Sequence, residues 1–194
     1  MPAAIRVVDL AGPDRERAVP VLEEGFVGIY RWHAKRTLRS VTAVRAAEED
    51  GRVVGVALLE RLAPEVGYVY YLSVARAGRQ KGVGGRLLDD ALSRFTREGV
   101  TIVYGAVEED NRPSRRLFES RGFRLVERRE LNWREGGLGA EGLRSRMWVV
   151  HGEVVYGRRL DPPVAPTADP QPHRETDVSA PLLPTPRTPL GESR

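Results

Sequence analysis

The stretch RQKGVGGR, Arg79 to Arg86, decides the fold, because it joins an aromatic and apolar run at 69–74 to an amphipathic run that begins at Val83. Its glycines at 82, 84 and 85 let the backbone approach an anion closely. A helix that begins here would direct unpaired N–H groups and the positive end of its dipole at that anion. The segment therefore predicts a strand, a phosphate-binding loop and a helix, in that order.

The run after the loop has the periodicity of a helix with one apolar face. Apolar side chains recur at spacings of three, four or five residues, which places them on one side of a helix: Val83, Leu87, Leu88, Ala91, Leu92 and Phe95. We expect a helix over residues 83–98 that packs this face against a sheet.

Two common nucleotide motifs do not match the loop. A Walker A loop needs Gly-Lys followed by Ser or Thr, whereas Lys81 precedes Gly82 and no hydroxyl residue follows. A dinucleotide fingerprint needs a third glycine at the position that Leu87 occupies. Neither an NTPase nor a Rossmann dinucleotide site is indicated.

A second segment, NRPSRRLFESRGF at 111–123, has the signals of a short helix. Asn111 is an N-cap candidate, Pro113 falls in the first turn, where its missing N–H costs nothing, and Gly122 ends the helix. Leu117 and Phe118 are expected to face the core. A strand is expected to follow from Phe123.

The two segments together resemble the GNAT superfamily of acyl-CoA-dependent N-acyltransferases, whose pyrophosphate loop reads Q/R-x-x-G-x-G/A. The resemblance covers residues 67–123. It implies an α/β (α+β) fold, with a mixed, mostly antiparallel central sheet of about seven strands flanked by helices. We expect this N-acetyltransferase domain to span residues 1–159.

The remaining elements are expected from apolar alternation and turn signals. One or two helices, interrupted near Pro20 and at 25–28, are expected within 14–39. Strands are expected at 5–10, 41–47, 52–62, 67–74, 101–107, 123–133 and 147–151, with a hairpin turn at 49–51 and a glycine-rich connection at 135–146.

The last part of the chain has a different composition. Nine of the fourteen prolines lie between Pro162 and Pro189, with few large apolar residues among them. Such a segment buries too little surface to offset its ordering entropy. We expect residues 160–194 to form a disordered or extended tail, and leave a recognition role open.

Composition excludes several classes of protein. No apolar run approaches the ~20 residues of a membrane span, and the N-terminus lacks a signal peptide's apolar core, so a soluble cytoplasmic protein is expected. The absence of cysteine removes disulfides, thiolate metal sites and an acyl-cysteine intermediate. The three histidines are too scattered to predict a metal site.

Charge gives little support to nucleic-acid binding. The chain has 31 basic and 27 acidic residues, for a formal charge of +4, and the basic residues are spread out. A modest positive field near the loop would still favour an anionic cofactor such as coenzyme A. A nucleic-acid or protein-interaction domain that uses the basic surface and the tail is kept as an alternative class.

The resemblance implies a set of positions that bind acetyl-CoA. The backbone of Leu72, Ser73 and Val74 would bind the pantetheine arm, and the Val74 amide would polarise the thioester carbonyl as an oxyanion donor. The backbone amides at Gly82, Val83, Gly84, Gly85 and Arg86 would hold the pyrophosphate. Arg79, Gln80 and Lys81 would lie near the phosphates, and Asn111, Ser114 and Phe118 would line the far side of the cofactor.

Catalysis departs from the family pattern at two places. Many relatives carry a glutamate base on the fourth strand, at the positions of Tyr68 and Tyr70. The base here is either a water held by these tyrosines or a carboxylate such as Glu60, Glu65 or Glu108. Many relatives also carry, at the position of Phe118, a tyrosine that protonates the leaving thiolate. A thiol pKa of ~8.5 makes the thiolate a tolerable leaving group without that acid.

The acceptor site would be built, by the same resemblance, from the segment after the first strand and from the last connection of the sheet. The candidates are Glu23, Glu24, Phe26, Tyr30, Trp32, His33, Trp133, Glu135 and Glu141. We expect direct transfer to a primary amine of a small or amino-acid-like molecule. The alternatives are an acyl-CoA-binding module with little turnover and a protein N-terminal or lysine acetyltransferase, and a homodimer is left open.

Overall fold

The computed structural model describes residues 4–127 and 145–161. The first half of the described chain contains a short strand, three helical segments and a long hairpin. These are β1 (Arg6–Asp9), the 3-10 helix η1 (Gly12–Ala18), α1 (Val19–Gly25), α2 (Gly28–Ser40), β2 (Ala43–Glu49) and β3 (Arg52–Ala63).

The second half alternates strands and helices before it closes the sheet. Its elements are β4 (Val66–Val74), the 3-10 helix η2 (Arg76–Gly78), α3 (Val83–Arg97), β5 (Ile102–Glu108), α4 (Arg112–Glu119), β6 (Arg124–Leu125) and β7 (Glu153–Arg159). The two helices expected from the glycine-rich segments are both present, and each begins within one residue of its predicted start.

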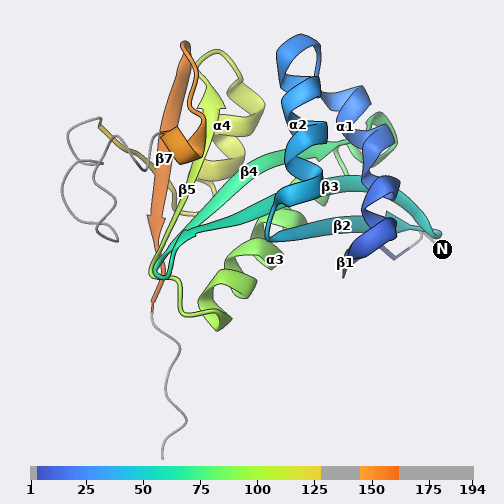
Figure 1. Ribbon diagram of the computed structural model, residues 1–194, viewed down its shortest axis with the longest axis horizontal. Helices are drawn as coiled ribbons and strands as arrows, with labels where there is room; N and C mark the ends of the chain where they lie inside the picture. Colours follow the sequence, from blue (N-terminus) through green and yellow to red (C-terminus); the bar gives the residue numbers. More distant parts are fainter. Residues whose placement is uncertain (1–3, 128–144, 162–194) are drawn as a thin grey trace, which may run out of the picture. The chain divides into compact units, whose positions relative to one another are not determined.

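The described strands form one sheet in the order β1-β2-β3-β4-β5-β7-β6. Neighbouring strands are antiparallel except for β4 and β5, which run parallel. Helix α3 lies on one face of the sheet, and α1 and α2 lie on the other (Figure 1). The expected mixed, mostly antiparallel sheet of seven strands flanked by helices is therefore confirmed.

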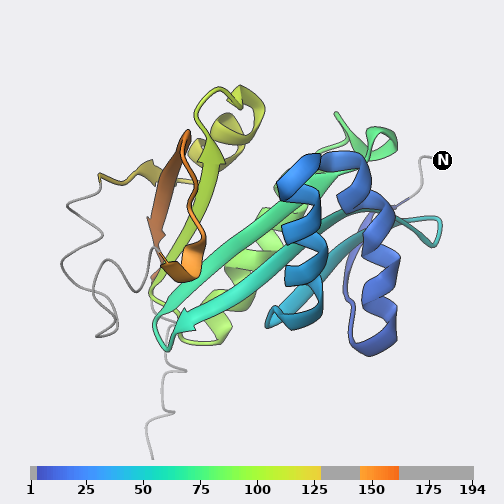
Figure 2. The same ribbon diagram turned by 45° about the horizontal axis from the view of Figure 1, so that its top comes forward.

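The sheet opens in its middle. Pairing between β4 and β5 covers only Val66–Val69 against Ile102–Gly105, and beyond this point the strands diverge (Figure 2). The other edge of β4 stays paired with β3 as far as Val74. The remaining length of β4, Tyr70 to Val74, thus has a sheet neighbour on one side and an open edge on the other.

Helix α3 owes its position to one apolar face. The six side chains that the periodicity selects are each no more than 7% exposed, and they belong to the core cluster beneath the sheet. Burying an aliphatic or aromatic side chain of this kind contributes ~1.5–3 kcal/mol. This packing holds the start of α3, and the loop before it, beside the end of β4.

The hairpin between β2 and β3 turns where expected. Asp50 and Gly51 both have positive φ, at 49° and 76°, the combination that matches the twist of a two-residue hairpin. The carboxylate of Glu48, 4% exposed, accepts hydrogen bonds from Arg6 at 2.9 Å and from Arg17 at 2.6 Å. These two ion pairs tie β1 and η1 to the hairpin.

Two boundaries differ from the predicted ones. The last strand was predicted at 147–151 and is instead β7, because Met147 ends a helical turn and Gly152, with φ of 85°, turns the chain before the Val154-Val155-Tyr156 run. Leu160, predicted to lie in the tail, is 8% exposed, packs in the core and donates its N–H to the Thr101 carbonyl at 2.8 Å. The core therefore extends past Arg159.

Other predicted segments lie partly or wholly outside the described residues. Of the strand expected at 123–133, the structure describes β6 and the residues to 127. Most of the connection at 135–146 and nearly all of the tail lie outside. The helical region is divided near Pro20 and at 25–28, as predicted. The 3-10 helix η1 gives way to α1 at Val19, and Pro20 lies in the first turn of α1, where proline is tolerated.

Candidate functional site

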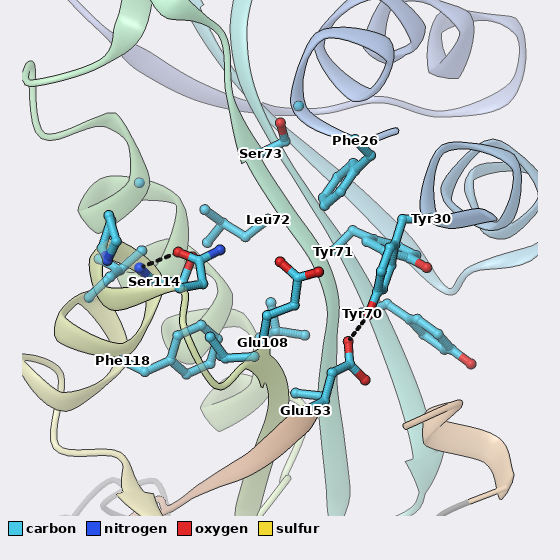
Figure 3. Close-up of a pocket in the computed structure, with 18 of the residues that line it drawn as sticks. Phe26, Tyr30, Tyr70, Tyr71, Leu72, Ser73, Glu108, Ser114, Phe118 and Glu153 are labelled. Atoms are coloured by element: carbon cyan, nitrogen blue, oxygen red, sulfur yellow. Dashed lines mark hydrogen bonds between the residues drawn. The ribbon is translucent and has the colours of Figure 1, made fainter. Parts of the chain in front are cut away.

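A cavity of about 520 Å³ occupies the opening between β4 and β5. Its walls come from the diverging halves of these strands, the start of α3, helix α4, the α1–α2 connection and the residues just before β7 (Figure 3). Five predicted backbone or loop positions line it, namely Leu72, Ser73, Val74, Arg79 and Gly84. The sheet opening and the glycine loop therefore belong to one site.

The start of α3 forms one end of this cavity. Gly82 is the N-cap in the left-handed region, with φ of 74°, and no side chain caps the helix. The Arg86 amide donates to the Gly82 carbonyl at 3.1 Å. The amides from Gly82 to Gly85 are the four that an α-helix leaves without an intrahelical partner. The Arg86 amide, which was also predicted to hold the pyrophosphate, is instead used within the helix.

Glycine at 84 keeps this end of the cavity open. A Cβ there would stand 3.3 Å from the Leu117 side chain and 3.7 Å from that of Leu72. The helix start thus presents bare backbone, with a dipole end that favours negative charge. This is the arrangement that a pyrophosphate needs.

Fewer of the loop's long side chains line the cavity than the sequence predicts. Arg79 lines it, and its Nε donates to the Val74 carbonyl at 3.3 Å. Lys81 instead pairs with Glu49 at 2.8 Å, and Arg86 donates to the Ile5 carbonyl at 3.3 Å. Gln80 is not among the lining residues, and Val83 is buried in the core.

Helix α4 supplies the opposite wall. The Asn111 side chain accepts the Ser114 amide at 3.1 Å, which confirms the predicted N-cap. Asn111, Ser114, Leu117 and Phe118 all line the cavity. Phe118 is 4% exposed, and its ring packs against the face of β5 where a Cβ on Gly105 would meet it at 2.4 Å.

The side of the cavity opposite α4 is aromatic. The rings that line it are Phe26, Tyr30, Tyr68, Tyr70, Tyr71 and Trp148. Residues 58 and 59 of β3 pair with Tyr71 and Val69, so Tyr70 is the extra residue of a β-bulge. A bulge re-aims side chains, and here it brings Tyr70 and Tyr71 to within 5.9 Å of each other, ring to ring.

His33, a predicted acceptor-site residue, lies behind this aromatic wall. Its ring stacks on Trp148 at 3.6 Å, and its Nδ1 is 2.8 Å from the Tyr71 hydroxyl. Burial lowers the pKa of His33, and Arg36 adds to this effect. His33 supports the wall from outside the cavity lining.

The two tyrosines of the predicted proton path differ in burial. Tyr68 is 2% exposed and hydrogen-bonds the Ala106 backbone, and burial raises its pKa well above the ordinary value. The Tyr70 hydroxyl donates to the Arg146 carbonyl at 2.5 Å, and burial also raises its pKa. Both hydroxyls are protonated at neutral pH, so neither is itself a proton acceptor.

Two of the predicted carboxylate bases lie outside the cavity lining. Glu65 is exposed in the turn between β3 and β4. Glu60 accepts the Thr42 amide at 2.9 Å and the Thr42 hydroxyl at 3.0 Å. Glu108, the third predicted carboxylate, does line the cavity.

A carboxylate that the sequence analysis did not select completes the site. Glu153, the first residue of β7, lines the cavity and is half-buried. It accepts the Tyr30 hydroxyl at 3.3 Å and the Val150 amide at 2.9 Å. Burial raises its pKa, the charge of Glu108 adds to the rise, and the two hydrogen bonds oppose it.

The hydrogen bond between Tyr30 and Glu153 has a fixed direction. Burial and the neighbouring carboxylates raise the pKa of Tyr30 to about 12, so its hydroxyl donates and Glu153 accepts. Tyr30 also meets Trp148 edge to face at 6.0 Å. Glu153 is thereby held with its carboxylate in the cavity (Figure 3).

The remaining acceptor candidates are more remote or lie outside the described residues. Glu23 pairs with Lys35 at 2.6 Å, and Glu24 accepts the Arg76 amide at 2.6 Å. Trp32 is 57% exposed and is not a lining residue. The candidates from the last connection, Trp133, Glu135 and Glu141, lie outside the described residues.

The described residues contain neither a metal-binding cluster nor a membrane-spanning helix. Within 4–127 and 145–161, no group of three or more His, Cys, Asp or Glu side chains is arranged to hold a metal ion. No helix in the same ranges is long and apolar enough to cross a membrane.

Comparison with known proteins agrees with this geometry. Residues 6–123 match the Acetyltransferase (GNAT) family. N-alpha-acetyltransferase 40 of Saccharomyces cerevisiae is 38% identical over 106 residues, which are 51% of this chain and 36% of that protein. Mycothiol acetyltransferase of Corynebacterium aurimucosum is 38% identical over 64 residues, 33% of this chain and 21% of that protein. The chain thus spans between a fifth and about a third of the length of these curated relatives.

A solved structure shares the fold. A GNAT family acetyltransferase from Elizabethkingia anophelis, with acetyl-CoA bound, superposes with a TM-score of 0.58 at 15% identity, covering 80% of this chain and 98% of that one. The family match extends over more than half of the chain and includes the glycine loop, β4, β5 and α4. The chain therefore belongs to the GNAT family of acetyltransferases.

Proposed function

We propose that this protein transfers an acetyl group from acetyl-CoA directly to the primary amine of a small molecule. One observation carries the proposal. A single cavity has an uncapped, glycine-lined helix start at one end and the carboxylate of Glu153 among aromatic rings at the other. The first end suits a pyrophosphate, and the second suits an amine that must lose a proton.

The residues present fit acetyl-CoA, which the family uses. The amides from Gly82 to Gly85 and the side chain of Arg79 would hold the pyrophosphate. The open edge of β4, with the Val74 amide as the proposed oxyanion donor, would bind the pantetheine arm. When bound, acetyl-CoA supplies a thioester whose carbonyl carbon accepts a nucleophile.

Glu153 is the proposed proton acceptor. An amine of pKa ~10.4 is neutral only about once in 2,500 molecules at pH 7, which is ~4.6 kcal/mol of barrier. Its burial makes Glu153 a stronger base than an exposed glutamate, and Tyr30 and Val150 fix its position. Glu153 would take the first proton of the ammonium group. The neutral amine nitrogen would then form the new C–N bond, the thioester C–S bond would break, and coenzyme A would leave as the thiolate, with the second amine proton passing to water or to that thiolate.

Transfer without an acyl-enzyme is expected, because the chain has no cysteine. Kinetics should show a ternary complex, without a burst of acyl-enzyme. Thiol release from acetyl-CoA against a panel of amines is the direct test. No thiol background arises from the protein itself.

The cofactor end can be tested separately from turnover. Acetyl-CoA at 100 times its dissociation constant should stabilise the fold by ~2.7 kcal/mol. Gly84→Glu places bulk and negative charge at the helix start and should abolish this shift, whereas Ser93→Glu adds the same group on the exposed face of α3 and should not. An unchanged response in Gly84→Glu would refute the assignment of the pyrophosphate site.

A second acceptor class is favoured by a specific observation. The 38% identity to N-alpha-acetyltransferase 40 makes the α-amine of a protein N-terminus the alternative acceptor. Peptides with free N-termini, assayed beside small amines of equal concentration, decide between the two. Acetyl-CoA binding without thiol release from either class would instead indicate a binding module.

Three further expectations stay proposals. These are a cytoplasmic location, an end of the folded domain near residue 160, and a homodimer as an open possibility. Cell fractionation tests the first and sedimentation tests the last, while truncation tests the domain boundary.

A further inference from the structure

Two glutamates face each other across the last strand pair. Glu108 at the end of β5 and Glu153 at the start of β7 are register partners, so their side chains leave the sheet on the same face. Directly opposed residues in antiparallel strands have Cβ atoms about 4.5–5.5 Å apart. Both side chains line the cavity, and Figure 3 shows both carboxylates within it.

The pair is unusual because like charges opposite each other are destabilising. The charge of Glu108 contributes to the raised pKa of Glu153, so the repulsion is felt within the folded protein. Hydrogen bonds from Tyr30 and Val150 hold Glu153, whereas Glu108 is exposed at the cavity edge. A ligand with positive charge would relieve the repulsion.

We propose that the acceptor is a small diamine, whose second ammonium group binds Glu108 while its reacting amine loses a proton to Glu153. The proposal rests on the proposed function, since it assigns the substrate class of the same site. One glutamate becomes neutral as it takes the proton, and the other remains available to a second cation. A monoamine would leave that second carboxylate without a partner.

The aromatic wall supports a cationic acceptor. Phe26, Tyr30 and Trp148 line the cavity on the side of the two carboxylates. Aromatic faces attract ammonium groups by ~0.5–1 kcal/mol at exposed sites and by more when water is excluded. Among the described lining residues the one Lys or Arg side chain is Arg79, which follows β4 and leads into the glycine loop. A carboxylate on the acceptor would therefore meet two negative charges.

Three acceptors with the same four-carbon chain test the charge directly. Butane-1,4-diamine, butylamine and 4-aminobutyrate differ at the far end, which is positive, neutral or negative. We expect kcat/KM to fall in that order, with the diamine about fivefold or more above butylamine, the size of an exposed ion pair with a cation–aromatic contact. Equal values for diamine and monoamine would overturn the proposal.

Glu108→Gln should remove the preference. In this variant the ratio of diamine to butylamine should fall to near one, because the second ammonium loses its partner. Glu109→Gln removes the same charge one residue along, outside the cavity lining, and should keep the ratio. An unchanged ratio in Glu108→Gln would also overturn the proposal.

A binding measurement separates this inference from the proposed function. With coenzyme A present, the diamine should raise the melting temperature more than butylamine does, and Glu108→Gln should erase the difference. If no amine yields thiol but this binding preference remains, the proposed function fails and the charge assignment stands. If amines are acetylated without any charge preference, the function stands and the inference fails.

Discussion

Replacing Glu153 by glutamine is the most informative single change in this site. The glutamine oxygen can accept the Val150 amide, and its NH2 group can donate to the Tyr30 hydroxyl, which then reverses its role. Shape and hydrogen bonding are thus preserved, and the variant differs mainly in the loss of a proton acceptor. Its effect on rate therefore reports on base catalysis.

The expected loss of kcat/KM follows from the free energy needed to deprotonate the acceptor amine. About 4.6 kcal/mol of barrier at pH 7 comes from deprotonating an amine of pKa ~10.4, and a positioned base typically contributes 10²- to 10⁴-fold. Glu153→Gln should lower kcat/KM by that factor at pH 7. Because the variant needs an amine that is already neutral, its rate should rise about tenfold per pH unit, while the parent's rate stays nearly flat.

Thiol release measured from about pH 6.5 to 9.5 tests both the size and the slope. Glu65→Gln, on an exposed glutamate outside the cavity lining, is the matched control and should behave as the parent. A Glu153→Gln variant within threefold of the parent at pH 7, or one with a parallel pH profile, would refute the role of this carboxylate.

The same variant should not be less stable. Glu153 has a folded-state pKa above its ordinary value of 4.5, so the native state holds the proton more tightly than the unfolded chain does. Its contribution to stability is therefore largest below pH 4.5 and declines as pH rises through the folded-state pKa. At pH 7 the glutamine variant should melt at or above the parent temperature, which also shows that lost activity is not lost folding.

Phe118→Tyr should raise kcat by less than about tenfold, or ~1.4 kcal/mol, because a thiol of pKa ~8.5 leaves readily without an acid. A hundredfold gain in the rate of thiol release would show that protonation of the thiolate limits turnover. Glu48 has a pKa lowered by its two paired arginines, so its contribution to stability is present above pH 4.5 and is lost as pH falls through the folded-state value. Glu48→Gln should reduce this loss of stability at low pH, measured as the free energy of unfolding in urea at several pH values. A loss of the same size in the variant would contradict the ion-pair account. A chain that ends after Asp161 should melt within ~2 °C of the full chain. A chain that ends after Arg159 lacks Leu160 and should melt ~4–8 °C lower, for a loss of about 2 kcal/mol in the free energy of unfolding. Equal melting temperatures would place the domain boundary at Arg159, where the sequence predicts it.

The sequence predicted those elements whose own residues show a clear local pattern, such as helical periodicity or a turn pair. The face of α3 follows from spacing alone, and the hairpin turn follows from Asp50-Gly51, which suits positive φ. The strand β7 was misplaced because Met147-Trp148-Val149-Val150 is as apolar as a strand. The signal for β7 in the sequence is the apolar run Val154-Val155-Tyr156 after Gly152.

The acceptor side of the site could not be predicted in this way, because its geometry depends on contacts between segments that are distant in the sequence. Glu153 enters the cavity because β7 pairs with β5 in a register that opposes it to Glu108. That register arises from the packing of distant segments. Likewise Lys81 looked like a phosphate ligand from its place in the loop, but Glu49, on a distant strand, holds its ammonium group.

The divergence of β4 and β5 also bears on aggregation. A strand with unpaired backbone groups at the outer margin of a sheet is a template for pairing with another chain. Here the unpaired length of β4 lies inside the sheet, facing β5 and the α4 wall across the cavity. A second polypeptide would need to enter a wedge already closed at one end by four residue pairs. A single extended arm that ends in a small group could enter from the open end, so the protein can offer strand-like hydrogen bonds to a ligand without offering them to its neighbours.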